Sequence, residues 1–302
     1  MRPGRFGRYA IRTADGVQEA AYLPIGGIEQ YIRVRGRSRA NPVLLVLHGG
    51  PGSTLGATAC RWQGALEAAF TVVHWDQRGS GNTYYRDPAA PPPTGERLLS
   101  DLDELVDALR ARYGRDRLFL LGHSWGSLLG GLYALRRPEK LSAWLPVSQM
   151  VDFKRSEQVS AAEAIRRARE AGREKDAERL AQELEQVLAL RRLDRAGAGA
   201  LLRFRRRKER YLPPQYGGPS PLGGLAAPEL TGNDLRWKLR FDRMLAANAA
   251  LYEELLGGLS LDGCPPRYGV PVILTAGERD WTTPYPFAAA YYDTLSAPCK
   301  VF

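Results

Sequence analysis

The 302-residue sequence predicts an α/β protein with a mainly parallel sheet flanked by helices and a helical insertion. Apolar runs typical of buried strands alternate along the chain with amphipathic helices, which is the pattern of a parallel sheet. Polar, Gly-rich motifs follow these runs, at the carboxyl ends of strands where such sheets gather their functional sites. Between residues 151 and 266 the pattern changes to charged helices without a convincing strand.

Each element follows from a local pattern. Residues 8–12 and 28–34 favour an antiparallel hairpin region with a turn at Asp15-Gly16. A helix is expected over residues 97–113, because leucines recur on one face of that stretch. The remaining strands are expected at residues 43–48, 71–75, 118–122, 141–151 and 271–276.

The charged helical stretch predicts an inserted cap that lies over the active edge of the sheet. It is broken by the Pro/Gly-rich segment PPQYGGPSPLGG. The expected organisation is a first part of the α/β core at residues 1–150, a helical cap at 151–266 and a second part of the core at 267–302.

Composition limits the class of protein. A hydrophobic fraction of 44% and a charged fraction of 25% are typical of a globular protein in solution. Three cysteines, Cys60, Cys264 and Cys299, are too few and too scattered for a disulfide framework or a CxxC metal site, which fits a reducing compartment. Because neither a leader-like apolar segment nor a membrane span is evident, we expect a cytoplasmic protein with no membrane partner.

The net charge of +10 raises the question of nucleic-acid binding. Much of the excess falls between residues 154 and 210, ending in RFRRRKER. The same stretch carries many acidic residues that can form i,i+4 pairs, as in EAIRRAREAGREKDAERLAQELEQ. This pattern favours solvated helices over a polyanion-binding face, so we expect no nucleic-acid partner.

The stretch LFLLGHSWGSLLGGLYAL, at residues 118–135, turns from an apolar run into a helical pattern within a few residues. Gly122 and Gly126 remove side chains where the chain reverses. Ser124 stands at the apex, and the backbone N–H groups from Trp125 onward begin a helix without intrahelical partners, where they can stabilise an oxyanion. This is the arrangement of the nucleophile elbow of serine hydrolases.

Further motifs make the chain resemble the α/β-hydrolases of the proline iminopeptidase group over about residues 30–302. The motifs, in the order of that family, are HGGPG (His48 to Gly52), WDQRGSG (Trp75 to Gly81), GHSWGS (Gly122 to Ser127) and GERDWTTP (Gly277 to Pro284). The resemblance implies that His48 supports its loop and that Asp76 and Arg78 tie loops together.

The resemblance also implies catalytic roles. It makes Ser124 the nucleophile and Asp280 the acid that orients a catalytic histidine. The oxyanion donors would be the N–H groups of Trp125 and Gly50, with Gly49 as the alternative second donor. Acyl transfer of this kind needs no metal or organic cofactor, and none is expected.

The sequence departs from the family pattern at one catalytic group, the histidine that acts as the base. A serine hydroxyl needs a base to accept its proton, and α/β-hydrolases supply it from a histidine that follows the acid. The three histidines of this chain, His48, His74 and His123, all precede Asp280. His123 is adjacent to Ser124, so its ring is expected to point away from the hydroxyl. Because the chain stops at APCKVF, in a strand-like run, we expect a C-terminally incomplete copy of a hydrolase.

The leading functional hypothesis is a serine hydrolase that cleaves an N-terminal residue from a small peptide, or a small amide, through an acyl-enzyme. An esterase or amidase of the same fold and a non-catalytic binding protein are the alternatives. In the family a cap carboxylate commonly binds the free amine of the substrate, and five residues are candidates: Glu157, Glu163, Glu209, Glu253 and Glu254.

Overall fold

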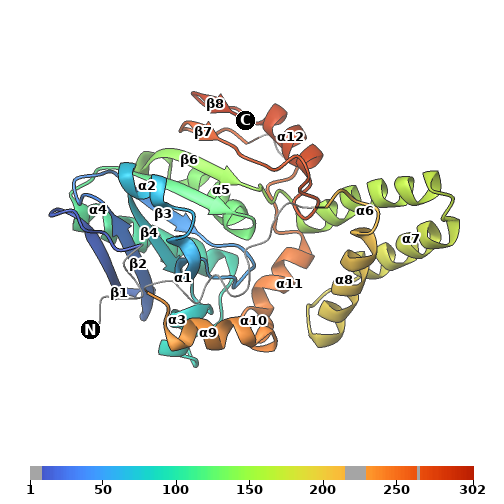
Figure 1. The fold of residues 1–302 in the computed structure, drawn as a ribbon, viewed down its shortest axis with the longest axis horizontal. Coiled ribbons are helices and arrows are strands. Elements are labelled where there is room, and N and C mark those ends of the chain that lie inside the picture. Colours follow the sequence, from blue (N-terminus) through green and yellow to red (C-terminus); the bar gives the residue numbers. More distant parts are fainter. Residues whose placement is uncertain (1–8, 215–228, 264–265) are drawn as a thin grey trace.

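The computed structural model of the chain describes residues 9–214, 229–263 and 266–302. Its centre is an eight-stranded sheet with the order β1-β2-β4-β3-β5-β6-β7-β8 (Figure 1). The strands are β1 (Val17–Ile25), β2 (Ile28–Gly36), β3 (Val43–Leu47), β4 (Thr71–Asp76), β5 (Leu118–His123), β6 (Leu141–Val147), β7 (Val272–Ile273) and β8 (Lys300–Val301). β2 pairs antiparallel with β1 and β4, and every pair from β4 to β8 is parallel. The expected mainly parallel sheet is therefore confirmed.

The N-terminal hairpin differs from the expectation. Its strands are β1 and β2, and the turn between them is Gly26-Gly27, with φ of 57° and 76°. A type I′ hairpin turn needs positive φ at both central positions, which two glycines adopt at little cost. Asp15-Gly16 forms a separate turn before β1, where Gly16 N–H donates to the Thr13 carbonyl over 3.0 Å. Residue 8 of the expected first strand lies outside the described residues.

Helices cover both faces of the sheet. On one face, α4 (Gly95–Tyr113) and α5 (Trp125–Arg136) pack against Leu45 and Leu47 in the main hydrophobic core. On the other face, Leu44 and Val46 pack with apolar residues around α1 (Gly56–Ala59) and α2 (Gly64–Ala69). Successive residues of β3 thus point to opposite faces and are all buried, which explains its unbroken apolar sequence. Two further helices, α3 (Gly81–Arg86) and α12 (Tyr285–Thr294), follow β4 and β7.

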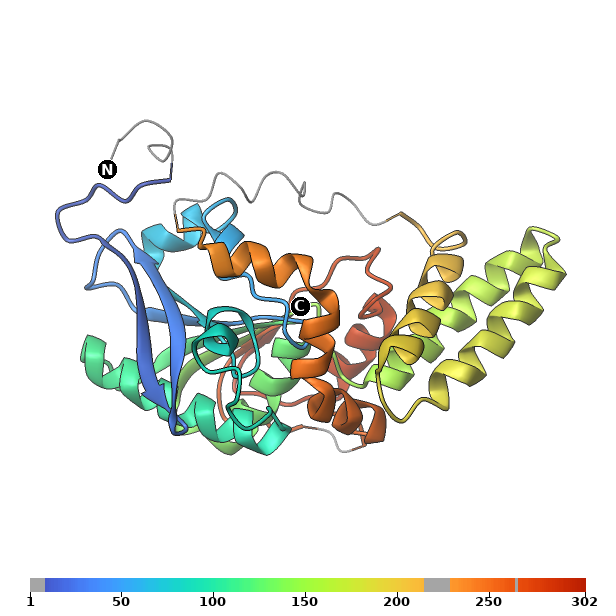
Figure 2. The same cartoon turned by 90° about the horizontal axis from the view of Figure 1, so that it is seen from below.

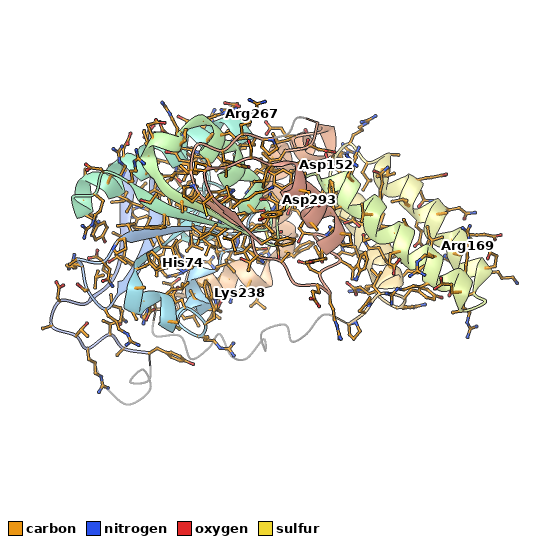
Figure 3. All side chains as sticks on the ribbon, turned by 90° about the horizontal axis from the view of Figure 1, so that it is seen from above. His74, Asp152, Arg169, Lys238, Arg267 and Asp293 are labelled. Carbon is orange, nitrogen blue, oxygen red and sulfur yellow. The ribbon has the colours of Figure 1, made fainter. Side chains whose placement is uncertain are left out.

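The chain between β6 and β7 forms helices, with no strand among the described residues from 148 to 263. Three of them, α6 (Phe153–Glu170), α7 (Glu174–Leu188) and α8 (Arg195–Lys208), form an arm that extends away from the sheet (Figures 1 and 2). Arg169 lies near the outer end of this arm, far from the core residue His74 (Figure 3). The other three, α9 (Gly232–Leu239), α10 (Phe241–Ala247) and α11 (Ala249–Gly257), lie against the core. Most of the expected Pro/Gly break, at residues 215–224, is outside the described residues.

Buried ion pairs join distant parts of the chain. Arg33 of β2 contacts Asp234 of α9 over 2.6 Å, and both side chains are buried. Arg78 of the DQRG turn contacts Asp101 of α4 over 2.7 Å and also donates to the Gly26 carbonyl. Arg78 therefore connects the DQRG turn to α4 and to the turn between β1 and β2. No helix in the described part of the chain is long and apolar enough to traverse a bilayer.

Candidate functional site

Ser124 occupies the turn between β5 and α5 with φ 53° and ψ −118°, a backbone conformation that non-Gly residues rarely adopt. Its neighbours explain how the chain holds this turn. A Cβ on Gly122 would lie 2.2 Å from the Gly126 carbonyl oxygen, and one on Gly126 would lie 2.3 Å from the Leu47 carbonyl oxygen. Only glycine fits at either position, so β5, α5 and the end of β3 can approach closely around Ser124.

The HGGPG loop follows β3 and packs against the same turn. A Cβ on Gly49 would lie 3.1 Å from Nδ1 of His123 and 3.2 Å from Cβ of Ser124. Gly50 follows with φ 114°, a conformation open to glycine. The N–H of Trp125, the first residue of α5, has no intrahelical acceptor. The structure thus brings Ser124, Trp125 and the Gly49-Gly50 segment together.

Side chains from the helices after the arm hold the HGGPG loop. Trp237 Nε1 of α9 donates to the Gly52 carbonyl over 2.7 Å, and the Tyr252 hydroxyl of α11 donates to the Pro51 carbonyl over 3.0 Å. Sequence reasoning missed both residues, because the signal is a contact between segments about two hundred positions apart in the chain. Their hydrogen bonds hold two consecutive carbonyl groups of the loop.

Asp280 lies at the same sheet edge as Ser124. His123 pairs with Val147 at the end of β6, and Val147 in turn forms a parallel bridge with Thr275, after which the chain leads to Asp280. Ser124 N–H also donates to the Val147 carbonyl over 3.0 Å. The carboxyl ends of β5, β6 and β7 are therefore in register, and no hydrogen bond joins Asp280 to Ser124 among the described residues.

The Asp280 carboxylate is fixed by the loop that follows it. One oxygen accepts from the backbone N–H groups of Thr282 and Thr283, over 2.9 and 3.1 Å. The other accepts from the Thr283 hydroxyl over 2.9 Å. These bonds account for the two threonines of the GERDWTTP motif, which orient a carboxylate that is partly buried at the sheet edge.

Two of the three histidines are tied into the core. His48 Nε2 accepts from the Gln77 N–H, so its Nδ1 carries the proton and donates to the Gly49 carbonyl over 2.9 Å. His74 Nε2 donates to the Gln63 side-chain oxygen over 2.7 Å. Burial lowers the pKa of His48 to about 4 and that of His74 to about 3. Both are neutral structural groups, as expected for His48.

His123 has a different environment. Burial lowers its pKa, and the negative charge of Asp280 raises it in partial compensation. Its Nδ1 is buried without a hydrogen-bond partner among the described residues. No hydrogen bond connects any of the three histidines to the Ser124 hydroxyl within the part of the chain described here. Within the described residues, Ser124 therefore has no paired base.

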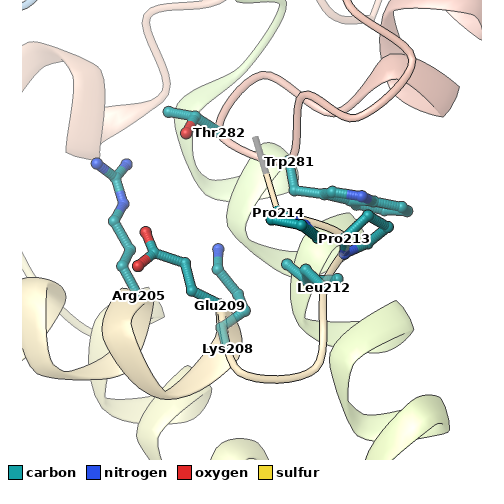
Figure 4. A pocket seen from close by; sticks show the side chains of 8 residues that line it. All are labelled: Arg205, Lys208, Glu209, Leu212, Pro213, Pro214, Trp281 and Thr282. Atoms are coloured by element: carbon teal, nitrogen blue, oxygen red, sulfur yellow. The ribbon is translucent and has the colours of Figure 1, made fainter. Parts of the chain in front are cut away.

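A cavity of about 390 Å³ lies beside the Asp280 loop (Figure 4). Trp281 and Thr282 of that loop form one wall, and residues at the C-terminal end of α8 form another. The side chains that line it are Arg205, Lys208, Glu209, Leu212, Pro213, Pro214, Trp281 and Thr282. Glu209 is the one candidate cap carboxylate that lines this cavity, and it is exposed to solvent.

The other four cap carboxylates have other surroundings. Glu157 is buried and paired with Arg205 and with Lys208 Nζ, which also donates to the Ser160 hydroxyl. Both cations lower its pKa against the opposing effect of burial.

The remaining three carboxylates, Glu163, Glu253 and Glu254, do not line the cavity beside the Asp280 loop. Glu163 pairs with arginines on the surface of α6, and Glu254 accepts from the Gly95 N–H over 2.7 Å. Glu253 lines a different cavity, between α8 and α11. No three His, Cys, Asp or Glu side chains of the described chain gather as a metal site would require.

Comparisons with known proteins agree with this architecture. The probable aminopeptidase YbaC of Bacillus subtilis (strain 168) is 38% identical over 130 residues, which are 43% of this chain and 41% of that protein. The proline iminopeptidase of Lactobacillus delbrueckii subsp. lactis is 34% identical over 113 residues, 37% of either chain. The matches thus span about two fifths of the length of these curated relatives.

Structural comparison shows the same fold. The crystal structure of the proline iminopeptidase of Mycobacterium smegmatis superposes with a TM-score of 0.60 at 22% identity, over 94% of this chain and 90% of that one. The family model described as the alpha/beta hydrolase fold matches residues 42–302. Because that match covers most of the chain, the protein belongs to the α/β-hydrolase fold family.

Proposed function

We propose that the protein is a serine hydrolase of the proline iminopeptidase type, which cleaves an N-terminal residue from a small peptide, or a small amide, through an acyl-enzyme on Ser124. One observation carries the proposal: Ser124 is held in a strained turn against a helix N-terminus and the HGGPG loop. The partial matches to proteins named aminopeptidase and proline iminopeptidase support the reaction class.

In the proposed reaction the Ser124 oxygen attacks the substrate carbonyl carbon and its proton passes to a base. The negative charge that develops on the carbonyl oxygen is stabilised by the N–H groups of Trp125 and Gly50, or of Gly49 in place of Gly50. The C–N bond breaks, the amine leaves with a proton from the base, and water then hydrolyses the ester on Ser124. Asp280 would orient an imidazole that acts as this base.

Glu209 is the cap carboxylate that best fits a substrate amine. It lines the cavity beside Trp281 and is exposed, whereas the carboxylate of Glu157 is already occupied by two cations. We therefore propose that Glu209 binds the α-amine of the substrate. The partners that this function requires are small peptides or amides.

The decisive experiment supplies the base from solution. Free imidazole should increase the rate at which an alanyl or prolyl p-nitroanilide is hydrolysed by the purified chain, because Ser124 has no paired base in the structure. Ser124→Ala should abolish the imidazole-dependent rate, and Asp280→Asn should reduce it. If Ser124→Ala responds to imidazole as the wild type does, Ser124 is not the nucleophile.

A second experiment tests the amine site. Glu209→Gln should weaken the binding of substrates that have a free α-amine and leave the binding of N-blocked amides unchanged. Glu185→Gln is the matched control, since it removes the same charge from an exposed position of α7 that lines neither cavity. Equal loss for free and blocked substrates would assign Glu209 a role unrelated to the amine.

One observation favours a second candidate function. The absence of a histidine bonded to Ser124, among the described residues, is compatible with a non-catalytic protein that only binds such ligands. Binding of an amino-acid amide without any acylation of Ser124, in the presence of imidazole, would support that candidate. Hydrolysis of esters without hydrolysis of the matched amides would support an esterase of the same fold.

A further inference from the structure

A second, larger cavity of about 680 Å³ lies between α8 and the α10–α11 pair. Its walls are mainly apolar, formed by Leu193, Ala198, Leu202, Phe241, Leu245 and Ala249. Leu202 is 41% exposed and Phe241 is 46% exposed, although both are large apolar side chains. A volume of this size is typical of a small-molecule site.

The wall on α8 continues into the cavity beside Asp280. Ala198 and Leu202 line the larger cavity, whereas Arg205 and Glu209 line the smaller one. These four residues are three or four positions apart, so they form one stripe along the helix. From Ala198 to Glu209 the stripe is roughly 16 Å long. The two cavities therefore lie end to end along one side of α8.

Small residues keep the larger cavity open. A Cβ on Gly199 would meet only the end of the flexible Arg203 side chain, at 3.3 Å. Ala249, on the opposite wall, is exposed. Five charged residues also line the cavity: Arg192 pairs with Asp194, Asp242 pairs with Arg240, and Arg195 and Glu253 are exposed to solvent. The remaining lining residues offer apolar surface to a ligand.

We propose that this cavity is a distal subsite of the substrate groove and that it binds an aliphatic moiety of the substrate. The inference rests on the proposed function, since it extends the same site from the amide to a longer aliphatic amide. An aliphatic chain that covers Leu202 and Phe241 removes apolar surface from water. Each added methylene that is buried strengthens binding about fourfold.

The test measures binding, so that it does not depend on turnover. Hexanamide, octanamide and decanamide are titrated calorimetrically into the full chain carrying Ser124→Ala. Affinity should rise about fourfold per methylene. Gly199→Leu and Ala249→Phe fill the cavity from opposite walls and should each remove this increase. Ala196→Leu, an exposed α8 position that does not line the cavity, should retain it.

The outcomes separate the two proposals. Affinities that do not change with chain length overturn the subsite, even if imidazole-dependent hydrolysis through Ser124 is observed. A chain-length dependence that persists in both filled variants also overturns it, because the aliphatic part then binds elsewhere. If Gly199→Leu fails to fold, Ala249→Phe still decides the question. Conversely, a chain-length effect without any acylation of Ser124 in the wild type retains the aliphatic site and removes the proposed reaction.

Discussion

The Leu47 carbonyl oxygen occupies the place where a side chain on Gly126 would begin, because an added Cβ would lie 2.3 Å from that oxygen. This contact brings the end of β3 to the first turn of α5. It places the HGGPG loop, which follows β3, next to the N-terminus of α5, where Ser124 and Trp125 lie.

Gly126→Ala should therefore destabilise the protein. The new methyl group meets backbone atoms that cannot rotate away, and overpacking of this kind typically costs about 1–3 kcal/mol. The free energy of unfolding in urea measures the effect. Gly257→Ala is the matched control, since a Cβ there meets nothing within 4 Å and its stability should be unchanged or slightly higher. Equal stabilities for the two variants would contradict the close approach.

Asp234→Asn should also lower stability. The change leaves the buried Arg33 guanidinium without its ion-pair partner, and loss of one member of a buried pair typically costs about 3–5 kcal/mol. Asp242→Asn removes a carboxylate from an exposed pair with Arg240 and should have little effect. Urea unfolding of both variants checks the prediction, which fails if Asp234→Asn is as stable as Asp242→Asn.

Stability should fall as the pH falls below about 6.5, the ordinary histidine pKa. His48 and His74 have folded-state pKa values of about 4 and about 3, so the unfolded chain binds protons that the folded chain does not. Each contributes a loss of up to about 1.4 kcal/mol per pH unit, which continues until its folded pKa is reached.

The comparison of wild type with His74→Gln isolates one of these contributions. The variant should lose stability less steeply between about pH 6 and pH 4, whatever its absolute stability. The prediction concerns the difference in unfolding free energy between the two proteins, not the profile of the wild type alone. Asp76, whose pKa is raised by burial, stabilises the folded state as the pH falls and so opposes the effect of the histidines. Parallel pH profiles would show that His74 is not kept neutral by the fold.

His123→Asn should leave the reaction of Ser124 with a fluorophosphonate probe unchanged and slow. His123 does not donate to or accept from the Ser124 hydroxyl in the described structure, and its Nδ1 is buried. Mass spectrometry of the labelled Ser124 peptide over time measures the rate. Rapid labelling of the wild type that disappears in His123→Asn or His74→Gln would identify that histidine as the base.

Local sterics explain why much of the site could be predicted from sequence. Gly122, Ser124 and Gly126 lie within five positions, and the turn they form depends mainly on their own backbones. The prediction of the hairpin turn at Asp15-Gly16 was wrong, because Asp15-Gly16 and Gly26-Gly27 are both sequences that favour turns. The choice between them depends on which strands pair, and β1 pairs with β2 from Val17 to Gly36.

Contacts between distant segments could not be predicted. Arg33 and Asp234 are separated by 201 positions, and no periodicity connects them. The five candidate cap carboxylates looked alike in sequence, because each is a Glu within a helical pattern. Only packing distinguishes Glu157, buried under two cations, from Glu209, which borders the cavity beside Trp281.

The hydrogen bonds from Trp237 and Tyr252 to the HGGPG loop attach one part of the helical insertion, the helices after the arm, directly to the candidate site. Helices α9 and α11 are hydrogen-bonded to the loop that contains the proposed oxyanion donor Gly50. The larger cavity of the proposed substrate groove lies between α8 and the α10–α11 pair. The two walls of that groove are therefore attached differently: the α10–α11 wall includes a helix bonded to the HGGPG loop through Tyr252, whereas no hydrogen bond among the described residues joins α8 to that loop.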